Sequence, residues 1–153
     1  SNNYCLADYI APVNDFLGSF ALTTGHGLKE LTREFEKDND DYSSIMSKII
    51  ADRLVEAFSE KMHEIIRKDL WVYSKDESLS INDLIKERYQ GIRPAPGYPA
   101  CPDHQHKDYI WQMLEVERNT GITLTETRSM FPAASLSGWY FSNPKSKYFM
   151  ISR

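Results

Sequence analysis

The chain has 153 residues, of which 41% are hydrophobic and 12% aromatic, so it holds enough apolar material for a single domain with one core. Its formal net charge of −4 at pH 7 excludes the basic footprint expected of a nucleic-acid-binding protein. No run of about 18 apolar residues occurs, and we therefore expect no membrane span.

The N-terminal third is predicted to form a strand followed by a short helix. Residues 15–24 (DFLGSFALTT) mix apolar and small side chains in the manner of a strand. After a glycine-rich turn, residues 28–37 place their leucines and a phenylalanine on one helical face. The acidic run at residues 38–41 then breaks the helix and offers an N-cap to the element that follows.

The strongest predicted element is a long helix over residues 42–71. Its apolar residues recur every three or four positions, and neither glycine nor proline interrupts it. About 28 residues at about 1.5 Å each give a helix of roughly 40 Å, which is expected to span the molecule. We interpret its apolar stripe as part of the core.

The C-terminal half is predicted to mix helices and strands. Two further helices are expected, from a Ser80 cap to about Tyr89 and over residues 106–119, with Gly121 ending the second. Three strands are expected, over residues 123–127, 138–141 and 147–151. A turn at residues 143–146 would join the last two into a hairpin. The predicted fold class is therefore α+β: a twisted antiparallel sheet with one long helix and several shorter helices.

Residues 93–102 (RPAPGYPACP) form the most informative segment of the sequence. Four prolines within nine residues exclude a helix interior or a central strand and favour a stiff extended loop. Such a loop would hold Arg93 and Tyr98 at a fixed separation, as in a cradle for a small ligand. The residues alone also allow a simple connector between two elements.

Other residues that could bind a metal or act in catalysis give only weak evidence for such a site. Cys101, His104 and His106 have the ligand types of a zinc site, but no second cluster supports them. A hydrolase triad could draw on Asp103, His104 and a serine at 135 or 137, although no G-x-S-x-G motif is present. Dinucleotide and P-loop motifs are also absent from the sequence.

Acidic and aromatic side chains near the proline-rich loop could recognise a cation. Glu56 and Glu87 lie in or beside helices that could bracket the loop, unless both are solvated surface carboxylates. Asp52 lies four residues before Glu56, on the same helical face. Aromatic pairs at 140–141 and 148–149 would each send one ring to either face of the predicted hairpin, where a sulfonium or ammonium would be favoured.

Several segments, in order along the whole chain, resemble the activation domain of cobalamin-dependent methionine synthase. They are LADYIAP (6–12), DDYSSIM (40–46), ADRLVEAF (51–58), YQGIRPAPGYP (89–99), PAAS (132–135) and SGWYFS (137–142). The R-x-x-x-G-Y motif in its proline setting, followed by G-W-Y-F-S, is the most specific part. The resemblance favours the ligand cradle over the connector.

The resemblance implies a site for S-adenosylmethionine. Arg93 would pair with the ligand carboxylate, for which a guanidinium fork is suited. The backbone at Ala95 and the side chain of Tyr98 would contact the adenosine. Other contacts of the ligand, its amino group or sulfonium included, would involve Glu56, Glu87, Tyr148 and Phe149.

The resemblance also implies a reaction, reductive reactivation, and a set of partners. An electron from flavodoxin or a flavoprotein reductase would convert inert cob(II)alamin to cob(I)alamin, which takes the methyl group of S-adenosylmethionine. Because cobalt is the nucleophile, no catalytic residue is expected in this chain. Cobalamin would be bound by another domain, which Asp52 would face, and zinc would belong to a further domain of the full enzyme.

The extent of the domain and its cellular location can also be anticipated. Family members are longer, so residues 1–153 would be part of an activation domain, without its N-terminal part and C-terminal helix, and inactive alone. Two cysteines, Cys5 and Cys101, fit reduced thiols in a cytoplasmic protein. The alternative function is a ligand-independent docking module for the cobalamin domain or flavodoxin.

Overall fold

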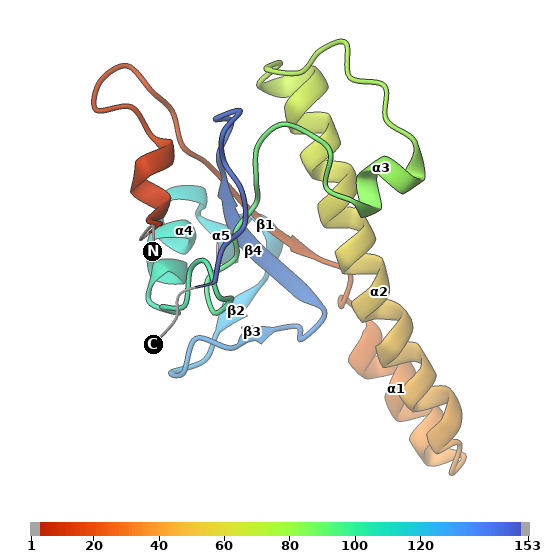
Figure 1. Ribbon diagram of the computed structural model, residues 1–153. Helices are drawn as coiled ribbons and strands as arrows, with labels where there is room; N and C mark the ends of the chain where they lie inside the picture. The colour runs from red at the N-terminus through yellow and green to blue at the C-terminus, as the bar shows by residue number, and fades with distance from the viewer. Residues whose placement is uncertain (1–3, 151–153) are drawn as a thin grey trace.

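The computed structural model describes residues 4–150 and has the predicted α+β fold (Figure 1). The strands are β1 (Gly18–Thr23), β2 (Thr123–Leu124), β3 (Met130–Phe131) and β4 (Ser135–Tyr140). The helices are the 3₁₀-helix η1 (Leu6–Tyr9), α1 (Leu28–Lys37), α2 (Asp41–Ile65), the π-helical turn η2 (Ile66–Leu70), α3 (Ile81–Ile85), α4 (His106–Leu114) and α5 (Val116–Thr120). No helix within the described range is both long and apolar enough to cross a membrane.

The central sheet is built from segments far apart in the sequence. β1 and β4 pair antiparallel, from Gly18 opposite Tyr140 to Thr23 opposite Ser135. Beyond β4, Ile92 and Phe141 exchange two backbone hydrogen bonds of 3.0 Å, and the Trp139 N–H donates to the Pro94 carbonyl at 3.0 Å. The start of the proline-rich loop therefore runs beside β4 as a third extended segment.

Both faces of this narrow sheet are covered. On one face, Phe20, Leu22 and Tyr140 pack with Val55 of α2. On the other, Trp139 and Phe141 join a larger cluster that includes buried residues of α4, α5 and the following turn: Ile110, Val116 and Ile122. The predicted alternation of the 140–141 pair is confirmed, because Tyr140 and Phe141 belong to different clusters. The expectation that one of these rings would be available to a cation is wrong, since both are buried.

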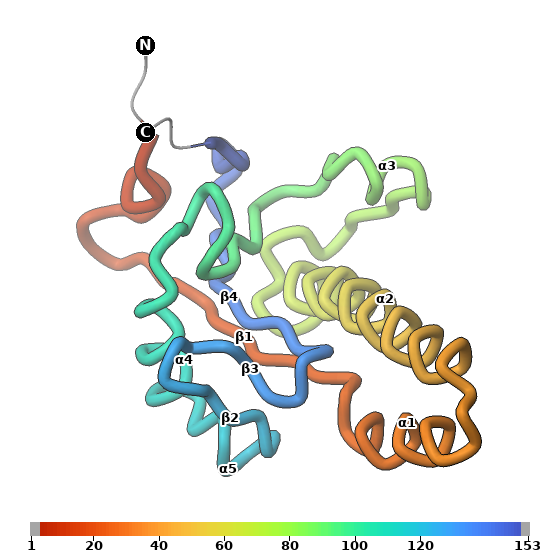
Figure 2. Tube along the Cα trace, turned by 90° about the horizontal axis from the view of Figure 1, so that it is seen from below, coloured from red at the N-terminus to blue at the C-terminus, as the bar shows by residue number. Residues whose placement is uncertain are grey.

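The long helix is confirmed, although much of its apolar stripe is not core. Asp40 caps α2 by accepting the Ser43 N–H at 2.9 Å, and η2 carries the chain on to Leu70. α1 packs beside the first half of α2 (Figure 2). The buried positions of α2 are Ser44, whose hydroxyl donates to Glu36 of α1 at 3.3 Å, and Ala51, Val55, Ser59 and His63, on the face that meets the sheet. The narrow sheet cannot cover the rest, so Ile45, Ile49, Ile50, Leu54 and Phe58 remain exposed.

The predicted C-terminal hairpin is wrong. β4 pairs with the distant β1, and residues 147–150 adopt no regular structure. The turn at 143–146 is confirmed by the Ser146 N–H, which donates to the Asn143 carbonyl at 3.0 Å. Residue 151, the last of the predicted strand, lies outside the described residues.

The shorter elements match the predicted positions more closely than the predicted lengths. Ser80 caps α3 in a capping box with Asp83, but the helix ends at Ile85, well before Tyr89. The strand predicted over 123–127 shrinks to β2, which pairs with the unpredicted β3. Gly121 ends the predicted 106–119 helix as expected, with φ of 71°. That helix is split into α4 and α5 by Glu115, whose φ of 46° and ψ of 47° are left-handed.

Replacing Glu115 with glycine is expected to stabilise the protein. A left-handed backbone costs a residue with a Cβ roughly 1–2 kcal/mol, which glycine avoids. The exposed ion pair of Glu115 with Arg118 would be lost, but such pairs contribute about 0–1 kcal/mol. We expect urea denaturation to show a gain of up to about 1 kcal/mol in the free energy of unfolding. Glu117→Gly, inside α5, should instead destabilise; equal losses in both variants would contradict this interpretation.

Candidate ligand-binding site

A pocket of about 350 Å³ opens between α2, the proline-rich loop and residues 148–150. Its lining combines one acid and one guanidinium with aromatic and small apolar side chains. The lining residues are Phe20, Glu56, Ser59, Arg93, Pro94, Ala95, Tyr98, Pro99, Ala100, Leu136, Tyr148, Phe149 and Met150. A mostly apolar concavity with a few polar groups is typical of a small-ligand site.

The proline-rich loop is held by backbone hydrogen bonds within it and by the packing of the His104 ring against Gly97. Two short backbone bonds close it, from the Gly97 N–H to the Cys101 carbonyl at 2.8 Å and from the Cys101 N–H to the Tyr98 carbonyl at 2.9 Å. Gly97 has φ of 99°, and the ring of His104 occupies the space that a Cβ there would need. The pocket wall formed by this loop is therefore set by the fold.

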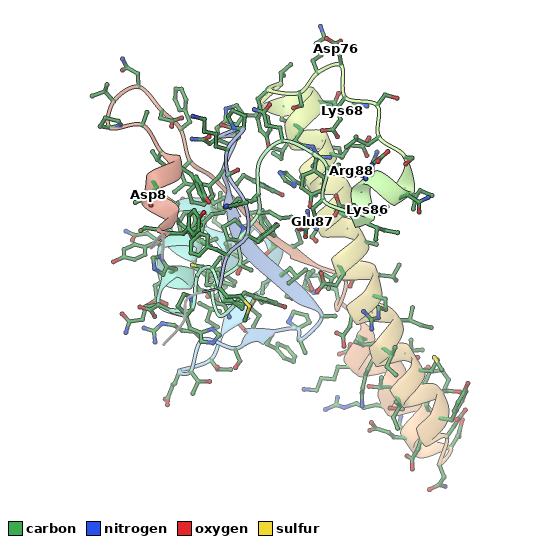
Figure 3. The ribbon with its side chains drawn as sticks, in the orientation of Figure 1. Asp8, Lys68, Asp76, Lys86, Glu87 and Arg88 are labelled. Atoms are coloured by element: carbon green, nitrogen blue, oxygen red, sulfur yellow. The ribbon has the colours of Figure 1, made fainter. Side chains whose placement is uncertain are left out.

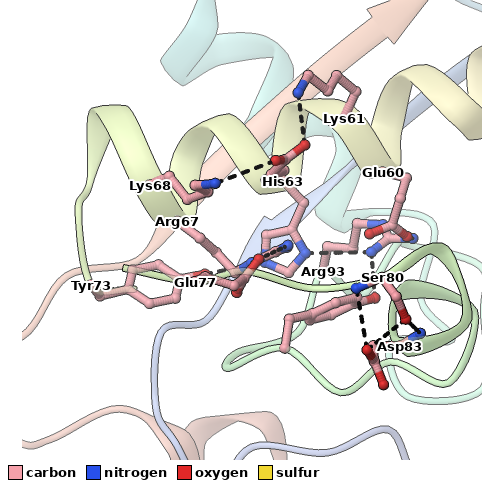
Figure 4. A network of polar contacts seen from close by, with 12 residues as sticks. Glu60, Lys61, His63, Arg67, Lys68, Tyr73, Glu77, Ser80, Asp83 and Arg93 are labelled. Carbon is pink, nitrogen blue, oxygen red and sulfur yellow. Dashed lines mark hydrogen bonds and ion pairs between the residues drawn. The ribbon is translucent and has the colours of Figure 1, made fainter. Parts of the chain in front are cut away.

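The side chain of Arg93 is held by three partners outside the loop (Figure 4). Its Nη2 donates to Glu60 Oε2 at 2.7 Å, and its Nη1 donates to the hydroxyl of Tyr89 at 2.6 Å. The same Nη1 lies 3.3 Å from Nδ1 of His63. The backbone N–H of Arg93 also donates to the Tyr148 hydroxyl at 3.0 Å. Arg93 is thereby fixed between α2 and the C-terminal segment.

His63 is completely buried and neutral. Burial, with the nearby Arg67 and Arg93 cations, lowers its pKa to about 2. Since Arg93 is a donor only, Nδ1 must accept its hydrogen, and Nε2 then carries the proton donated to the Tyr73 hydroxyl at 3.1 Å. The ring stacks on Tyr140 with centroids 5.2 Å apart.

This histidine should make the protein less stable in mild acid. The unfolded chain binds a proton at the ordinary histidine pKa near 6.5, whereas the folded chain does not until about pH 2. The stabilising contribution is therefore complete above pH 6.5 and is lost as the pH falls below it. Between pH 7.5 and pH 5 the loss is about 2 kcal/mol in the free energy of unfolding. Urea denaturation should show a flatter pH dependence for His63→Phe; identical profiles would contradict a neutral His63.

A second buried ion pair supports the same region. Arg67 is fully buried and donates from Nε and Nη2 to both carboxylate oxygens of Glu77, at 2.7 to 3.1 Å. Its guanidinium lies 4.3 Å from the ring centre of Tyr89, the residue that also accepts from Arg93. Burial raises the pKa of Tyr73 to about 12 and that of Tyr89 further, so both hydroxyls stay protonated.

The structure gathers most of the predicted ligand residues around one pocket. Six of them line it: Glu56, Arg93, Ala95, Tyr98, Tyr148 and Phe149. Glu87 is not among the lining residues; it lies after α3 in the segment that also carries Lys86 and Arg88 (Figure 3). Its charge still acts on Tyr148, whose pKa is raised chiefly by burial and also by Glu87. Asp52 is exposed on α2, one turn before Glu56.

Sequence reasoning missed three residues that hold Arg93: Glu60, His63 and Tyr89. Two of them carried a usable signal, because Glu60 lies four residues after Glu56 and His63 three residues after Glu60, all on one helical face. Tyr89 lies four residues before Arg93 in a segment without regular structure, where spacing carries no such information.

The described residues are not arranged as either the metal site or the hydrolase triad that the sequence allowed. Cys101 and His106 line a different, more apolar groove, while His104 packs against Gly97. Within residues 4–150, no three His, Cys, Asp or Glu side chains are grouped to hold a metal ion. Ser135 donates to the Pro132 carbonyl at 2.6 Å, and Ser137 Oγ is buried without a hydrogen-bond partner among residues 4–150, so neither serine is bonded to a histidine.

The fold and pocket agree with similarities to known proteins. A family model described as vitamin B12 dependent methionine synthase, activation domain, matches residues 1–153. A crystal structure of the MetH reactivation domain bound to AdoHcy is 55% identical in sequence, with a TM-score of 0.94. The match covers 97% of this chain and 47% of that one, so this chain spans about half the length of the solved relative. The chain belongs to the activation-domain family of vitamin B12-dependent methionine synthases.

Proposed function

We propose that the pocket binds S-adenosylmethionine and presents its methyl group for the reductive remethylation of cob(II)alamin, as part of a methionine synthase. The observation that carries the proposal is the pairing of a fixed guanidinium, Arg93, with an acid, Glu56, in one aromatic-lined pocket. The solved relative with the same fold is bound to AdoHcy, the demethylated form of that ligand.

Arg93 retains the capacity to bind a carboxylate. A guanidinium has five N–H donors, and three are engaged by Glu60, Tyr89 and His63. Within residues 4–150, Nε–H and the second hydrogen of Nη2 have no partner. These two groups share an edge of the guanidinium, where parallel donors can hold both oxygens of the ligand carboxylate.

The remaining lining suits the other parts of the ligand. Glu56 supplies a negative charge that favours the ammonium or the sulfonium. The rings of Tyr98, Tyr148 and Phe149 offer faces for a cation and for the adenine. With a volume near 350 Å³, the pocket is in the range of small-molecule sites.

The chain's role in the reaction is positioning. A cobalamin held by another domain would supply the nucleophile once reduced by flavodoxin or a flavoprotein reductase. The pocket residues need only orient the methyl donor, which requires no acid or base. Asp52, exposed on α2 one turn before Glu56, would face the cobalamin domain. We further propose that residues 1–153 are part of a longer activation domain of a cytoplasmic enzyme and are inactive alone.

A charge test on Glu56 addresses the ligand directly. We expect Glu56→Gln to weaken S-adenosylmethionine about tenfold in calorimetric titration, because a charge-assisted contact is lost. Titrating AdoHcy, which lacks the methyl group and the positive sulfur, identifies the cation that Glu56 contacts. An equal loss of affinity for both ligands assigns Glu56 to the ammonium. A larger loss for S-adenosylmethionine assigns it to the sulfonium. Glu64→Gln, on α2 outside the pocket, is the control. Unchanged affinity for both ligands would contradict the proposed site.

A ligand-independent docking module is the second candidate. The exposed apolar residues of α2, among them Ile50, Leu54 and Phe58, favour it because they extend along the helix that carries Asp52. This function predicts that the unchanged chain and the Arg93→Ala variant bind an isolated cobalamin domain equally well, without added ligand. A dependence on S-adenosylmethionine would exclude it.

A further inference from the structure

We propose that His63 is a positioning residue that fixes the guanidinium of Arg93 in the orientation needed for the ligand carboxylate. The inference rests on the proposed function. It begins from a contact that the ligand does not explain: a fully buried imidazole lies 3.3 Å from a guanidinium nitrogen of the pocket.

Three contacts fix the His63 ring itself. It stacks on Tyr140 at an interplanar angle of 21°, and it meets the Tyr89 ring edge-on with centroids 5.0 Å apart. Its Nε2–H donates to the Tyr73 hydroxyl at 3.1 Å. A ring packed on two sides and bonded at one nitrogen can present the other nitrogen, Nδ1, in only one direction. That direction is occupied by Nη1 of Arg93.

The contact with Arg93 requires neutral histidine. A protonated imidazole would donate from both nitrogens and could not accept from a guanidinium. Two cations act on the ring, Arg67 of the π-helical turn η2 and Arg93 of the proline-rich loop. Each is itself paired with an acid, Arg67 with Glu77 and Arg93 with Glu60. Burial, together with the two arginine cations, keeps the ring neutral, so Nδ1 remains an acceptor.

His63 and Glu60 bind different nitrogens of the Arg93 guanidinium. Nη1 is taken up by His63 and Tyr89, and Nη2 shares one hydrogen with Glu60. Arg93 cannot turn without breaking at least one of these bonds, so its Nε edge keeps a single orientation. Because a bidentate pair demands coplanar donors, loss of His63 Nδ1 should weaken carboxylate binding while the rest of the pocket stays intact.

Two substitutions distinguish the role of the Nδ1 acceptor from that of the aromatic ring of His63. His63→Phe keeps an aromatic ring for stacking on Tyr140 but removes Nδ1. His63→Asn removes the ring but can place an amide oxygen near the Nδ1 position, which restores the acceptor. Each variant is titrated with S-adenosylmethionine and with 5′-methylthioadenosine, an analogue that lacks the carboxylate and amino group. Circular dichroism and thermal denaturation confirm that each protein is folded.

We expect His63→Phe to reduce the affinity for S-adenosylmethionine about tenfold, the value for one hydrogen bond to a charged group. The affinity for methylthioadenosine should change by no more than about twofold. His63→Asn should recover most of the affinity. Equal weakening of both ligands would show a merely structural role and overturn the proposal, as would unchanged binding of both. If His63→Phe does not fold, His63→Gln, whose amide reaches toward Nε2 instead, takes its place with the same expected result. Failure of the unchanged chain to bind either ligand would count against the proposed function itself.

Discussion

Replacing Arg93 with alanine is expected to reduce the affinity for S-adenosylmethionine by at least about thirtyfold. The substitution removes both donors left for the ligand carboxylate. Truncating one member of a hydrogen-bonded charge pair costs about 2–5 kcal/mol, and every 1.4 kcal/mol is a factor of ten in affinity. Calorimetric titration of the variant should therefore show no saturable heat at ligand concentrations that saturate the unchanged chain.

Arg93→Ala also affects the folded state, and this effect has to be separated from binding. The carboxylate of Glu60 would lose its cation, and its Oε1 is already a buried oxygen without a hydrogen-bond partner among the described residues. Adding Glu60→Gln to Arg93→Ala should restore part of the lost stability without restoring binding. Arg88→Ala is the matched control, because Arg88 is exposed and pairs with Asp83 outside the pocket. Binding by the double variant as tight as that of the unchanged chain would contradict the assigned role of Arg93.

Replacing Gly138 with alanine is expected to destabilise the protein strongly. Gly138 lies in β4 opposite Phe20 and beneath the proline-rich loop. A Cβ there would lie 2.7 Å from the Pro94 carbonyl oxygen and 2.8 Å from Cε1 of Phe20. The Phe20 ring is itself stacked on Tyr140 at 4.7 Å, so it cannot easily move away. We expect a loss of about 3 kcal/mol in the free energy of unfolding, at the upper end for overpacking.

The position of Gly138 links stability to the site. Relief of the clash would push Pro94 outward, and Pro94 neighbours Arg93 in the pocket lining, so ligand affinity should fall as well. Gly27→Ala provides the control, since no atom lies within 4 Å of a Cβ at that position and its φ of 77° adds only a local cost. That cost should be about 1–2 kcal/mol. Urea denaturation of the two variants tests the comparison, and an equal loss in both would show that the close approach at Gly138 is unimportant.

Local signals in the sequence predicted the elements that depend on neighbouring residues. The helix over 28–37 has the same bounds in the structure, Ser80 is the cap of α3, and the 143–146 turn is present. The sheet could not be predicted in this way. β1 pairs with β4 across more than 100 residues, and no alternation pattern specifies a partner so distant.

The errors have physical causes as well. Glu115 is an ordinary helix former, so its left-handed backbone, which splits α4 from α5, has no signature in the sequence. The apolar stripe of α2 predicted burial on all its positions, but how much of a helix is covered depends on the width of the sheet beneath it.

The candidate site shows the same division between local and tertiary information. The proline-rich loop indicated Arg93 and Tyr98, and both line the pocket. The partners that orient Arg93 come from three places in the chain: α2, the segment after α3, and the C-terminal segment at Tyr148. Only the fold brings these segments together, so their contacts with Arg93 could not be predicted, although the spacing of Glu60 and His63 on one face of α2 was a usable signal.

The most direct test of the account is a crystal structure of this chain with S-adenosylmethionine. We predict the ligand in the pocket between α2 and the proline-rich loop, with its carboxylate within hydrogen-bond distance of Nε and Nη2 of Arg93. Glu56 should face the ammonium or the sulfonium, and Glu60 and His63 should keep their present contacts. A ligand bound elsewhere, or bound here with its carboxylate away from Arg93, would contradict the account.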